Sequence, residues 1–414
     1  MHKIWIFACG EPHEIDDKNV RLHRAGKIAK FLSENKSKKV KLFTSTFDHV
    51  KKENRFKENK IIKINNNLET HFLKTIPYKK NISIIRLISN FFLGVRLYFY
   101  LKKQKDQPDL IFVAFPPIET SLACILFSKK RGIKTIIDVR DLWPEVFVEG
   151  YSKYLKSILK HCLFPYRIMT KYIFKKTFSL MSISKNMLDW SQNYAKRKNI
   201  YNDNFVPFSY INPSKFKVTE TDTIIDLKKK ILNKFNITLV GNVTKTIKFD
   251  DIYNAAIKLK NNEEIKFVIC GAGDNLEQTK LKCQNLKNII FTGWINQNEI
   301  QFILRNTKIG LIPYRNDVNL SNAMPNKFSE YMSFGIPILT SLSGSVLEIL
   351  NKEKIGIQYS SDSNDLYDKI LYLFSNESLL NDYKKNSKNL FLRSFEEGIN
   401  HDLIFNYFEN VYAK

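Results

Sequence analysis

The feature that most constrains this chain is a repeated order of short apolar segments and amphipathic segments, separated by Gly or Pro turns. The apolar segments are short and rich in Ile, Val and Phe, which is typical of strands buried on both faces. They cover residues 3–9, 108–115, 134–139, 237–240, 266–270, 289–292 and 309–313, and helical patterns follow most of them. A repeated strand–turn–helix order predicts parallel sheets covered by helices, which is a doubly wound α/β architecture.

The length of the chain predicts two domains. A chain of 414 residues is too long for a single hydrophobic core. The strand pattern pauses after residues 205–208, and a polar, Lys-rich segment at 214–233 is interpreted as a linker. We therefore expect an N-terminal domain over 1–208 and a second domain over 209–395.

The charge of the chain indicates an anionic partner. The formal net charge is +25, which suits nucleic acid, an anionic membrane face or a phosphorylated substrate. Zinc-finger spacing, RNP aromatic motifs and basic zippers are absent from the sequence, so we expect no nucleic-acid partner. The first residues form too short an apolar run for a signal peptide, and five scattered cysteines are typical of reduced thiols. Both observations favour the cytoplasm.

The stretch from Ser321 to Leu350 contains the most informative motif. Polar turn residues precede an expected helix that begins near Lys327 and ends at Gly335, and a strand follows at 336–340. Such a unit presents backbone N–H groups at a helix N-terminus, where a phosphate is favoured. Glu330 would lie on the same helix beside that position. An ordinary helix–strand unit of an α/β sheet would show the same pattern.

Four other strand ends carry candidate site residues. Gly10 follows the first strand, and the absence of G-x-G-x-x-G there argues against a dinucleotide. Gly241 follows a strand of the second domain, where glycine lets backbone amides approach a phosphate. Gly271 and Gly273 follow the next strand. The strand at 134–139 ends in RDLWPE, so its first two residues are either cleft residues or an internal ion pair.

The run PNKFSEYMSFGIPILTS resembles the donor-nucleotide signature of family 4 glycosyltransferases, which are retaining enzymes with the GT-B fold. RDLWPE and GEPHEIDDKNVRLHRAGKIAKFL resemble one branch of that family. The resemblance implies two Rossmann-like domains facing a cleft, with a last helix over 396–414 that packs back on the first domain. It also implies transfer of a hexose from a nucleotide diphosphate sugar, UDP-linked, to a lipid-linked or polysaccharide acceptor. The product would be a bacterial capsule, O-antigen or lipopolysaccharide.

The resemblance assigns roles to residues on the donor side. Glu330 would hydrogen-bond the ribose and Lys248 the diphosphate, while Asn242 and Asn322 stand where members commonly carry Arg and Glu. The expected donor-binding residues are Gly241, Asn242, Lys248, Gly271, Gly273, Trp294, Asn326, Lys327 and Glu330. No metal and no cofactor would be required if cations and backbone dipoles hold the diphosphate.

On the acceptor side the resemblance points to Gly10, Arg21, Arg24 and His49, with Thr46 and Asp48 nearby, and to Asp141 or Arg140 as the catalytic residue. The alternative to an acceptor-side role is that Arg21 and Arg24 are solvated charges on a helix, and the sequence favours neither. Asn322 and Asn242 leave open a non-catalytic scaffold of the same fold, and a nucleotide-sugar epimerase is a further alternative.

Two segments are candidates for membrane contact. Residues 81–105 and 153–176 combine Ile, Leu, Phe and Tyr with Lys and Arg. Charges inside the first segment argue against a span, because each costs roughly 2.5–3.5 kcal/mol at a bilayer centre. Interfacial helices on an anionic membrane and core-packing helices remain the two alternatives. The expected location is therefore peripheral, on the cytoplasmic face of the inner membrane.

Overall fold

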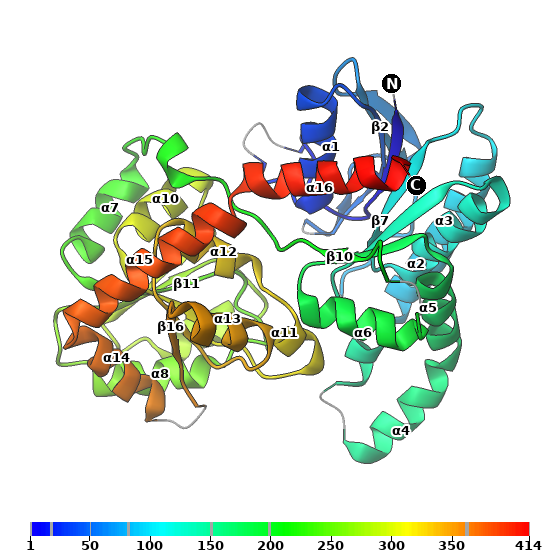
Figure 1. The fold of residues 1–414 in the computed structure, drawn as a ribbon. Coiled ribbons are helices and arrows are strands. Elements are labelled where there is room, and N and C mark those ends of the chain that lie inside the picture. Colours follow the sequence, from blue (N-terminus) through cyan, green and yellow to red (C-terminus); the bar gives the residue numbers. More distant parts are fainter. Residues whose placement is uncertain are drawn as a thin grey trace. The chain divides into compact units, whose positions relative to one another are not determined.

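The computed structural model describes residues 2–16, 20–49, 51–80, 83–149, 152–197, 200–360 and 364–413. These residues form two compact units. The first unit contains the chain up to Val206 together with the residues from His401 onward, and the second unit contains Pro207–Asn400. Figure 1 shows each unit as a twisted sheet with helices on both faces.

The first unit is built on an eight-stranded sheet in the order β10-β9-β8-β7-β1-β2-β6-β5. All neighbours are parallel except β5, which runs antiparallel to β6 at the edge. A short antiparallel pair, β3 (Phe47–Asp48) and β4 (Glu53–Asn54), lies outside this sheet. The strands of the sheet are β1 (Lys3–Phe7), β2 (Lys39–Ser45), β5 (Lys60–Lys63), β6 (Leu68–Leu73), β7 (Leu110–Phe115), β8 (Lys134–Val139), β9 (Ser179–Ser182) and β10 (Asn204–Phe205).

Helices cover both faces of the first sheet, so its central strands are apolar throughout. β7, for example, is LIFVAF with every side chain buried. One face packs on α2, α3, α5 and α6, and the other packs on α1 and α16, which lie side by side in Figure 1. The helices are α1 (Arg24–Asn35), α2 (Ile84–Lys102), α3 (Ile118–Arg131), α4 (Lys153–Cys162), α5 (Phe164–Lys176), α6 (Lys185–Ala195) and α16 (Glu397–Ala413), with a 3-10 turn at Glu145–Val148.

The second unit is a six-stranded, fully parallel sheet in the order β13-β12-β11-β14-β15-β16. Its strands are β11 (Phe235–Val240), β12 (Ile265–Cys270), β13 (Ile289–Gly293), β14 (Thr307–Ile312), β15 (Ile338–Thr340) and β16 (Gly356–Gln358). Helices α7, α10, α12, α13 and α15 cover one face, and α8, α9 and α14 cover the other.

The helices of the second unit follow the chain in regular alternation with its strands. They are α7 (Asp222–Ile231), α8 (Phe249–Lys258), α9 (Leu276–Lys282), α10 (Gln297–Arg305), α11 (Val318–Asn322), α12 (Asn326–Ser333), α13 (Ser345–Glu353), α14 (Asp365–Phe374) and α15 (Glu377–Ser394), preceded by a 3-10 turn at Pro213–Lys215. Strand–helix alternation of this kind is the doubly wound architecture that the sequence predicts.

Two local expectations were wrong. The segment 214–233 is not a plain linker, because it contains α7, whose Thr221 hydroxyl accepts a hydrogen bond from the Ile224 amide and whose Ile224, Leu227 and Ile231 are buried. The helix expected over 153–176 is two helices that meet at Leu163, where Pro165 in the first turn of α5 lacks an amide to continue α4.

Candidate active site

The second unit has its topological switch point between β11 and β14. From β11 the sheet continues through β12 and β13 in one direction and through β14, β15 and β16 in the other. Ligands of open α/β sheets bind beyond the carboxyl ends of the strands at such a point. The turn after β11 and the loop after β14 are joined there, because the Lys248 amide donates to the Pro313 carbonyl (2.7 Å) and the Arg315 amide to the Thr246 carbonyl (2.9 Å).

Three of the expected glycines lie together at this edge. Gly241, Gly271 and Gly273 have φ values of 124°, 134° and 148°, which residues with a side chain rarely adopt. A Cβ on Gly271 would lie 2.2 Å from the Gly241 carbonyl oxygen, and one on Gly273 would lie 2.4 Å from the Val243 carbonyl oxygen. The turns are therefore packed backbone to backbone, and Gly241 donates its amide to the Cys270 carbonyl at 2.8 Å. Asn242, by contrast, is exposed.

Helix α12 is held at the same edge by Tyr331. This side chain is completely buried, and its hydroxyl accepts a hydrogen bond from the Val240 amide (3.0 Å) and donates to the Thr238 carbonyl (3.0 Å). Gly310 of β14 leaves room for the ring, since a Cβ there would lie 2.5 Å from it. The first turn of α12 thus has a fixed position against β11 and β14, and Gly335, at φ +67°, ends the helix as the sequence predicts.

The first turn of α12 carries a buried lysine beside the Gly241 turn. The Lys327 residue is only 5% exposed, and its Nζ has no hydrogen-bond partner among the residues that the structure describes. Nζ lies 4.5 Å from the centre of the Tyr314 ring and 3.4 Å from the position of a Cβ on Gly241. A buried ammonium without an acceptor is costly, so this arrangement is one that a bound anion would stabilise.

Glu330 lies one turn further along the same helix. It is 2% exposed, and its charge adds to the burial that raises the pKa of Cys270, at the end of β12, to about 12. Glu330 therefore faces the β12 side of the switch point, while Lys327 faces the side of β11 and β14. Asn326, also expected at this site, is the first residue of α12. The structure brings Gly241, Gly271, Gly273, Asn326, Lys327 and Glu330 to one edge of the sheet.

Two other expected donor residues lie on neighbouring loops. Lys248 precedes the first residue of α8. Burial raises the pKa of Asp251, and the positive charge of Lys248 opposes this rise. Trp294 follows the end of β13 and is 78% exposed, so its indole presents a free apolar face. Asn322 ends α11, where its side-chain amide donates to the Val318 carbonyl at 2.6 Å.

The first unit has its own switch point between β1 and β7, and a cavity lies there. The cavity has a volume of about 90 Å³. Hydroxyl, amide and imidazole groups share its wall with apolar side chains: the lining residues are Cys9, Gly10, Ser45, Phe47, His49, Thr75, Tyr78, Arg86, Ser89, Asn90, Leu93, Pro116 and Pro117. Two expected acceptor-side residues, Gly10 and His49, are therefore in contact with one cavity.

Gly10 and His49 depend on each other. Gly10 has φ +74°, and a Cβ on it would lie 2.9 Å from the His49 Cβ. The imidazole Nδ1 is 2.7 Å from the Tyr78 hydroxyl. Burial, together with the positive charges of Lys52 and Arg86, lowers the pKa of His49 to about 4. His49 is therefore a neutral hydrogen-bonding group at pH 7.

Arg24 and Arg140 form a buried ion network at this edge. Asp138 Oδ2 accepts from Arg24 Nε (3.0 Å) and Arg140 Nε (2.7 Å), and Arg140 also pairs with Glu11. Arg24 additionally donates to the Val206 carbonyl at 2.8 Å. The interpretation of Arg24 as a solvated helix charge is therefore wrong. The two guanidinium groups hold the pKa of Asp138 below its usual range despite its burial.

The remaining acceptor-side and catalytic candidates are more exposed to solvent. Arg21 is exposed just before α1, and Asp141 is half-buried just after β8. Sequence reasoning missed Tyr78, Arg86 and Asn90, which line the cavity. Arg86 and Asn90 are polar residues four apart on an apolar helix, a spacing that places them on one face with the core residue Leu93 and could have identified them.

Within the described ranges, no group of three or more His, Cys, Asp or Glu side chains is arranged to hold a metal ion. The expectation of a metal-independent reaction stays a prediction. All five cysteines are free thiols.

A comparison with known families matches the second unit. Residues 221–390 match the family model described as glycosyl transferases group 1. The second unit is therefore similar in sequence to group 1 glycosyltransferases over these residues. A curated relative, an uncharacterized glycosyltransferase of Methanocaldococcus jannaschii, is 25% identical over 306 residues, which cover 72% of this chain and 74% of the relative. The chain is therefore a glycosyltransferase.

Solved structures establish the fold over the whole chain. Sucrose-phosphate synthase from Thermosynechococcus elongatus superposes with a TM-score of 0.77 at 13% identity and covers 100% of both chains. HepE of Anabaena, solved with UDP and glucose, gives a TM-score of 0.67 at 11% identity over 99% of this chain and 100% of its own. At these identities the likeness shows the fold alone, which is GT-B, as the sequence predicts.

Proposed function

We propose that this glycosyltransferase takes a hexose from a nucleotide diphosphate sugar, UDP-linked, and transfers it with retention to a lipid-linked or polysaccharide acceptor. The buried Lys327 ammonium at the switch point of the second unit carries this proposal, because no described residue provides its hydrogen-bond acceptor. A diphosphate supplies the missing acceptors and charge. The UDP and glucose in the HepE structure support the same donor class.

The residues around Lys327 have complementary roles in the proposed donor site. The diphosphate lies against the Gly241 turn and the N-terminus of α12, where backbone N–H groups favour negative charge. Glu330 accepts hydrogen bonds from the ribose hydroxyls, and Lys248 adds positive charge from the neighbouring loop. These groups stabilise the diphosphate as it leaves, when its charge grows.

In the proposed reaction the bond between the anomeric carbon and the phosphate oxygen breaks, and the acceptor oxygen bonds to the same face of the sugar. The proton of the acceptor hydroxyl moves to the departing phosphate oxygen, so no protein nucleophile is needed. The resemblance in RDLWPE supports a bacterial surface glycan as the acceptor. The transfer would then take place in the cytoplasm at the inner membrane. Asp141 and Arg140 are proposed to act on the acceptor side.

The full-length protein tests the donor assignment. A thermal-shift panel of UDP-, GDP- and ADP-sugars should give its largest rise in melting temperature with a UDP-sugar, because a ligand that binds only the folded state stabilises it. Glu330→Gln should weaken UDP binding about tenfold, or ~1.4 kcal/mol, and leave the melting temperature of the free protein nearly unchanged. Equal UDP affinity of Glu330→Gln and wild type in calorimetry would remove Glu330 from the ribose role.

A product assay separates transfer from the alternatives. Sugar transfer requires an acceptor, so omission of the acceptor should abolish product formation. Product that forms from the donor alone would indicate an epimerase instead. A folded chain that binds no nucleotide sugar would contradict the proposal altogether.

A further inference from the structure

Helix α2 is apolar on two sides, and only one of them is buried. Leu93, Leu97 and Leu101 belong to the core of the first unit. The other side leaves large apolar side chains at least 41% exposed, namely Ile84, Ile85, Ile88, Phe91, Phe92, Val95 and Phe99. An exposed apolar patch of this kind marks an interaction surface.

The same exposed apolar character continues over the helices next to α2. Helix α2 packs along α3, α3 along α5, and α4 contacts α5. Exposed apolar side chains on these three helices are Leu126, Tyr154, Leu155, Ile158, Phe164 and Ile168. In α4 none of the side chains that the structure describes is buried, so packing in the core does not explain its apolar residues. We call the exposed side chains of α2, α4 and α5 the basic-apolar face.

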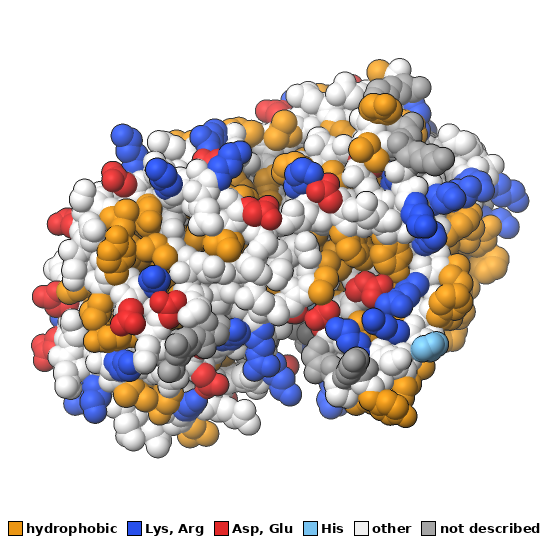
Figure 2. All heavy atoms as spheres, turned by 60° about the horizontal axis from the view of Figure 1, so that its bottom comes forward, with side chains coloured by type: hydrophobic (Ala, Val, Ile, Leu, Met, Phe, Trp, Pro, Cys, Tyr) orange, Lys and Arg blue, Asp and Glu red, His pale blue; other side chains and the backbone are white. Residues whose placement is uncertain are grey.

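The charges of this face have one sign. Residues 84–102 contain three Lys or Arg and residues 153–176 contain seven, and neither segment contains Asp or Glu. Several of these cations are exposed: Arg96, Lys102, Lys160, Lys171, Lys175 and Lys176. Figure 2 shows blue side chains beside orange ones on the first unit, at the right of the view. Apolar side chains rimmed by cations complement a bilayer with anionic headgroups.

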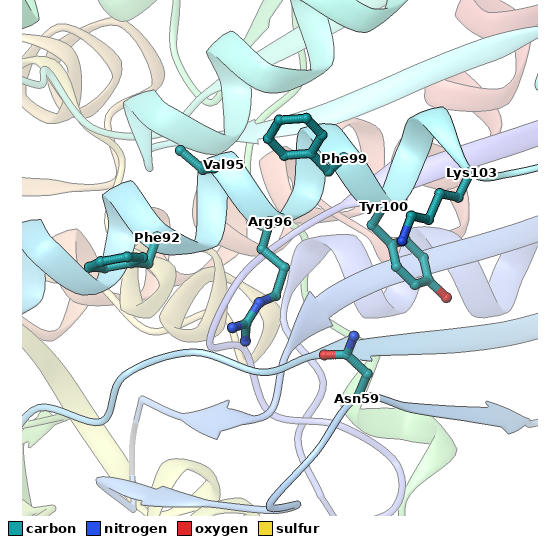
Figure 3. A pocket seen from close by; sticks show the side chains of 7 residues that line it. All are labelled: Asn59, Phe92, Val95, Arg96, Phe99, Tyr100 and Lys103. Atoms are coloured by element: carbon teal, nitrogen blue, oxygen red, sulfur yellow. The ribbon is translucent and has the colours of Figure 1, made fainter.

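A groove beside α2 combines both chemistries. It has a volume of about 310 Å³ and is lined by Phe92, Val95, Phe99, Tyr100, Arg96, Lys103 and Asn59. Figure 3 shows Arg96 of α2 and Lys103, the residue after this helix, projecting toward Asn59, while Phe92 and Phe99 lie along the helix. A groove with apolar rings and two cations suits the phosphate and upper acyl chain of a lipid.

We infer that the basic-apolar face docks the protein on an anionic lipid bilayer, with α2 and α4 lying in the plane of the interface. By length and composition α2 is long and apolar enough to cross a membrane. Its Leu93 side, however, is part of the folded core, so spanning would require α2 to leave the first unit. Docking needs no such rearrangement, and it is independent of which sugar the enzyme transfers.

Vesicle sedimentation with the full-length protein tests this inference. Vesicles of phosphatidylcholine with 25 mol% phosphatidylglycerol should sediment most of the protein, pure phosphatidylcholine several-fold less, and 0.5 M NaCl should reduce the anionic binding several-fold. No nucleotide is present, so failure here would leave the donor proposal intact. Equal binding to both vesicle types, or none to the anionic ones, would overturn the inference.

Two variants and one control locate the surface. Phe92→Ser with Phe99→Ser should weaken binding to anionic vesicles at least fivefold, and Lys171→Gln with Lys175→Gln should reduce the preference for anionic lipid. The control, Leu281→Ser with Tyr372→Ser, changes two exposed apolar residues of the second unit and should bind as wild type. Face variants that bind like the control would contradict the inference. Light scattering that shows a wild-type dimer, dissociated by the Phe variants without any vesicle binding, would assign the face to a second copy instead.

Discussion

The two units share one architecture but differ in the electrostatics of their switch points. In the first unit, Arg24 and Arg140 are both paired with Asp138, and Arg140 also with Glu11. In the second unit, the buried Lys327 has no hydrogen-bond acceptor within the described chain. At the first edge the two arginines are therefore paired with acids of the chain, whereas at the second edge the Lys327 ammonium lacks an acceptor among the described residues until a ligand binds.

This difference indicates which ligand each edge accepts. An unpaired buried ammonium favours an anion, because burial without a partner is costly and a charged hydrogen bond removes that cost. The cavity of the first unit is lined by hydroxyls such as those of Thr75, Tyr78 and Ser89 and by the neutral His49. Such groups suit the hydroxyls of a sugar acceptor. The comparison thus contrasts a buried cation on the donor side with a mainly hydroxyl-lined acceptor side, whose cavity also includes the Arg86 guanidinium.

The largest effect should come from breaking the ion network of the first unit. Asp138→Asn leaves Arg24 without its buried carboxylate, and removing one partner of a buried ion pair costs about 3–5 kcal/mol. We expect the urea midpoint of the first unit to fall accordingly. Tryptophan fluorescence is a suitable probe, because Trp5, Trp143 and Trp190 lie in this unit.

Asp189→Asn is the matched control for Asp138. Asp189 pairs with the exposed Lys185 on α6 of the same unit (2.7 Å), and such surface pairs contribute roughly 0.3–0.5 kcal/mol. If Asp138→Asn shifted the midpoint no more than Asp189→Asn, the first edge would not be held together by this network.

The second prediction concerns the pH dependence of the stability of the first unit. Glu119 lies in the first turn of α3, and burial raises its pKa from 4.5 to about 7. The hydrogen bond that Tyr166 donates to Glu119 Oε1 (3.0 Å) and the positive charge of Arg86 oppose this rise. The folded state therefore binds more protons than the unfolded state between these values, so stability falls as pH rises through this window. The loss for wild type is about 3 kcal/mol between pH 4.5 and 8.

Glu119→Gln should be as stable as wild type near pH 4.5 and more stable at pH 8. His13 and His49, whose pKa values burial lowers to about 4, act in the opposite direction and lose stability as pH falls from 6.5 to 4. They are unchanged in the variant, so the difference between the two proteins isolates Glu119. Denaturation midpoints from pH 4.5 to 8 measure it, with the exposed Glu277→Gln as control. Parallel pH profiles for wild type and Glu119→Gln would refute the raised pKa.

The sequence predicts β1, β7, β8 and β11 to β15, because burial on both faces gives a distinctive apolar run. It does not predict β2, β5, β6 or β16. The strand expected at 134–139 is β8 with the same bounds. Helices with polar surroundings were less predictable. Residues 222–231 resemble a linker in composition, and only the packing of their Ile and Leu side chains makes them α7.

The candidate site was predictable where backbone conformation restricts the residue. Gly241, Gly271 and Gly273 stand out in sequence because their turns need positive φ and close packing. The pairing of Arg24 and Arg140 with one carboxylate was not predictable, since it joins residues 114 positions apart. Only the fold shows that these arginines are neutralised while Lys327 is not.

The donor side supplies the third prediction, with the smallest expected effect. Lys327→Met removes the buried charge but keeps an apolar side chain of similar length against the Tyr314 ring. UDP binding should weaken by about 1.5–3 kcal/mol, the range for a hydrogen bond to a charged group. The melting temperature of the free protein should not fall, and we expect it to rise, because the unpaired ammonium is gone.

Lys245→Met is the matched control, since Lys245 lies on the same turn as Gly241 but is exposed. It should change UDP affinity little and the melting temperature hardly at all. Calorimetric titration and thermal unfolding of the three proteins give both quantities. A melting temperature that falls with Lys327→Met would mean that the ammonium already has a stabilising partner in the free protein. The contrast between paired arginines at the first edge and a lysine without an acceptor among the described residues at the second edge would then disappear, because both units would satisfy their own cations.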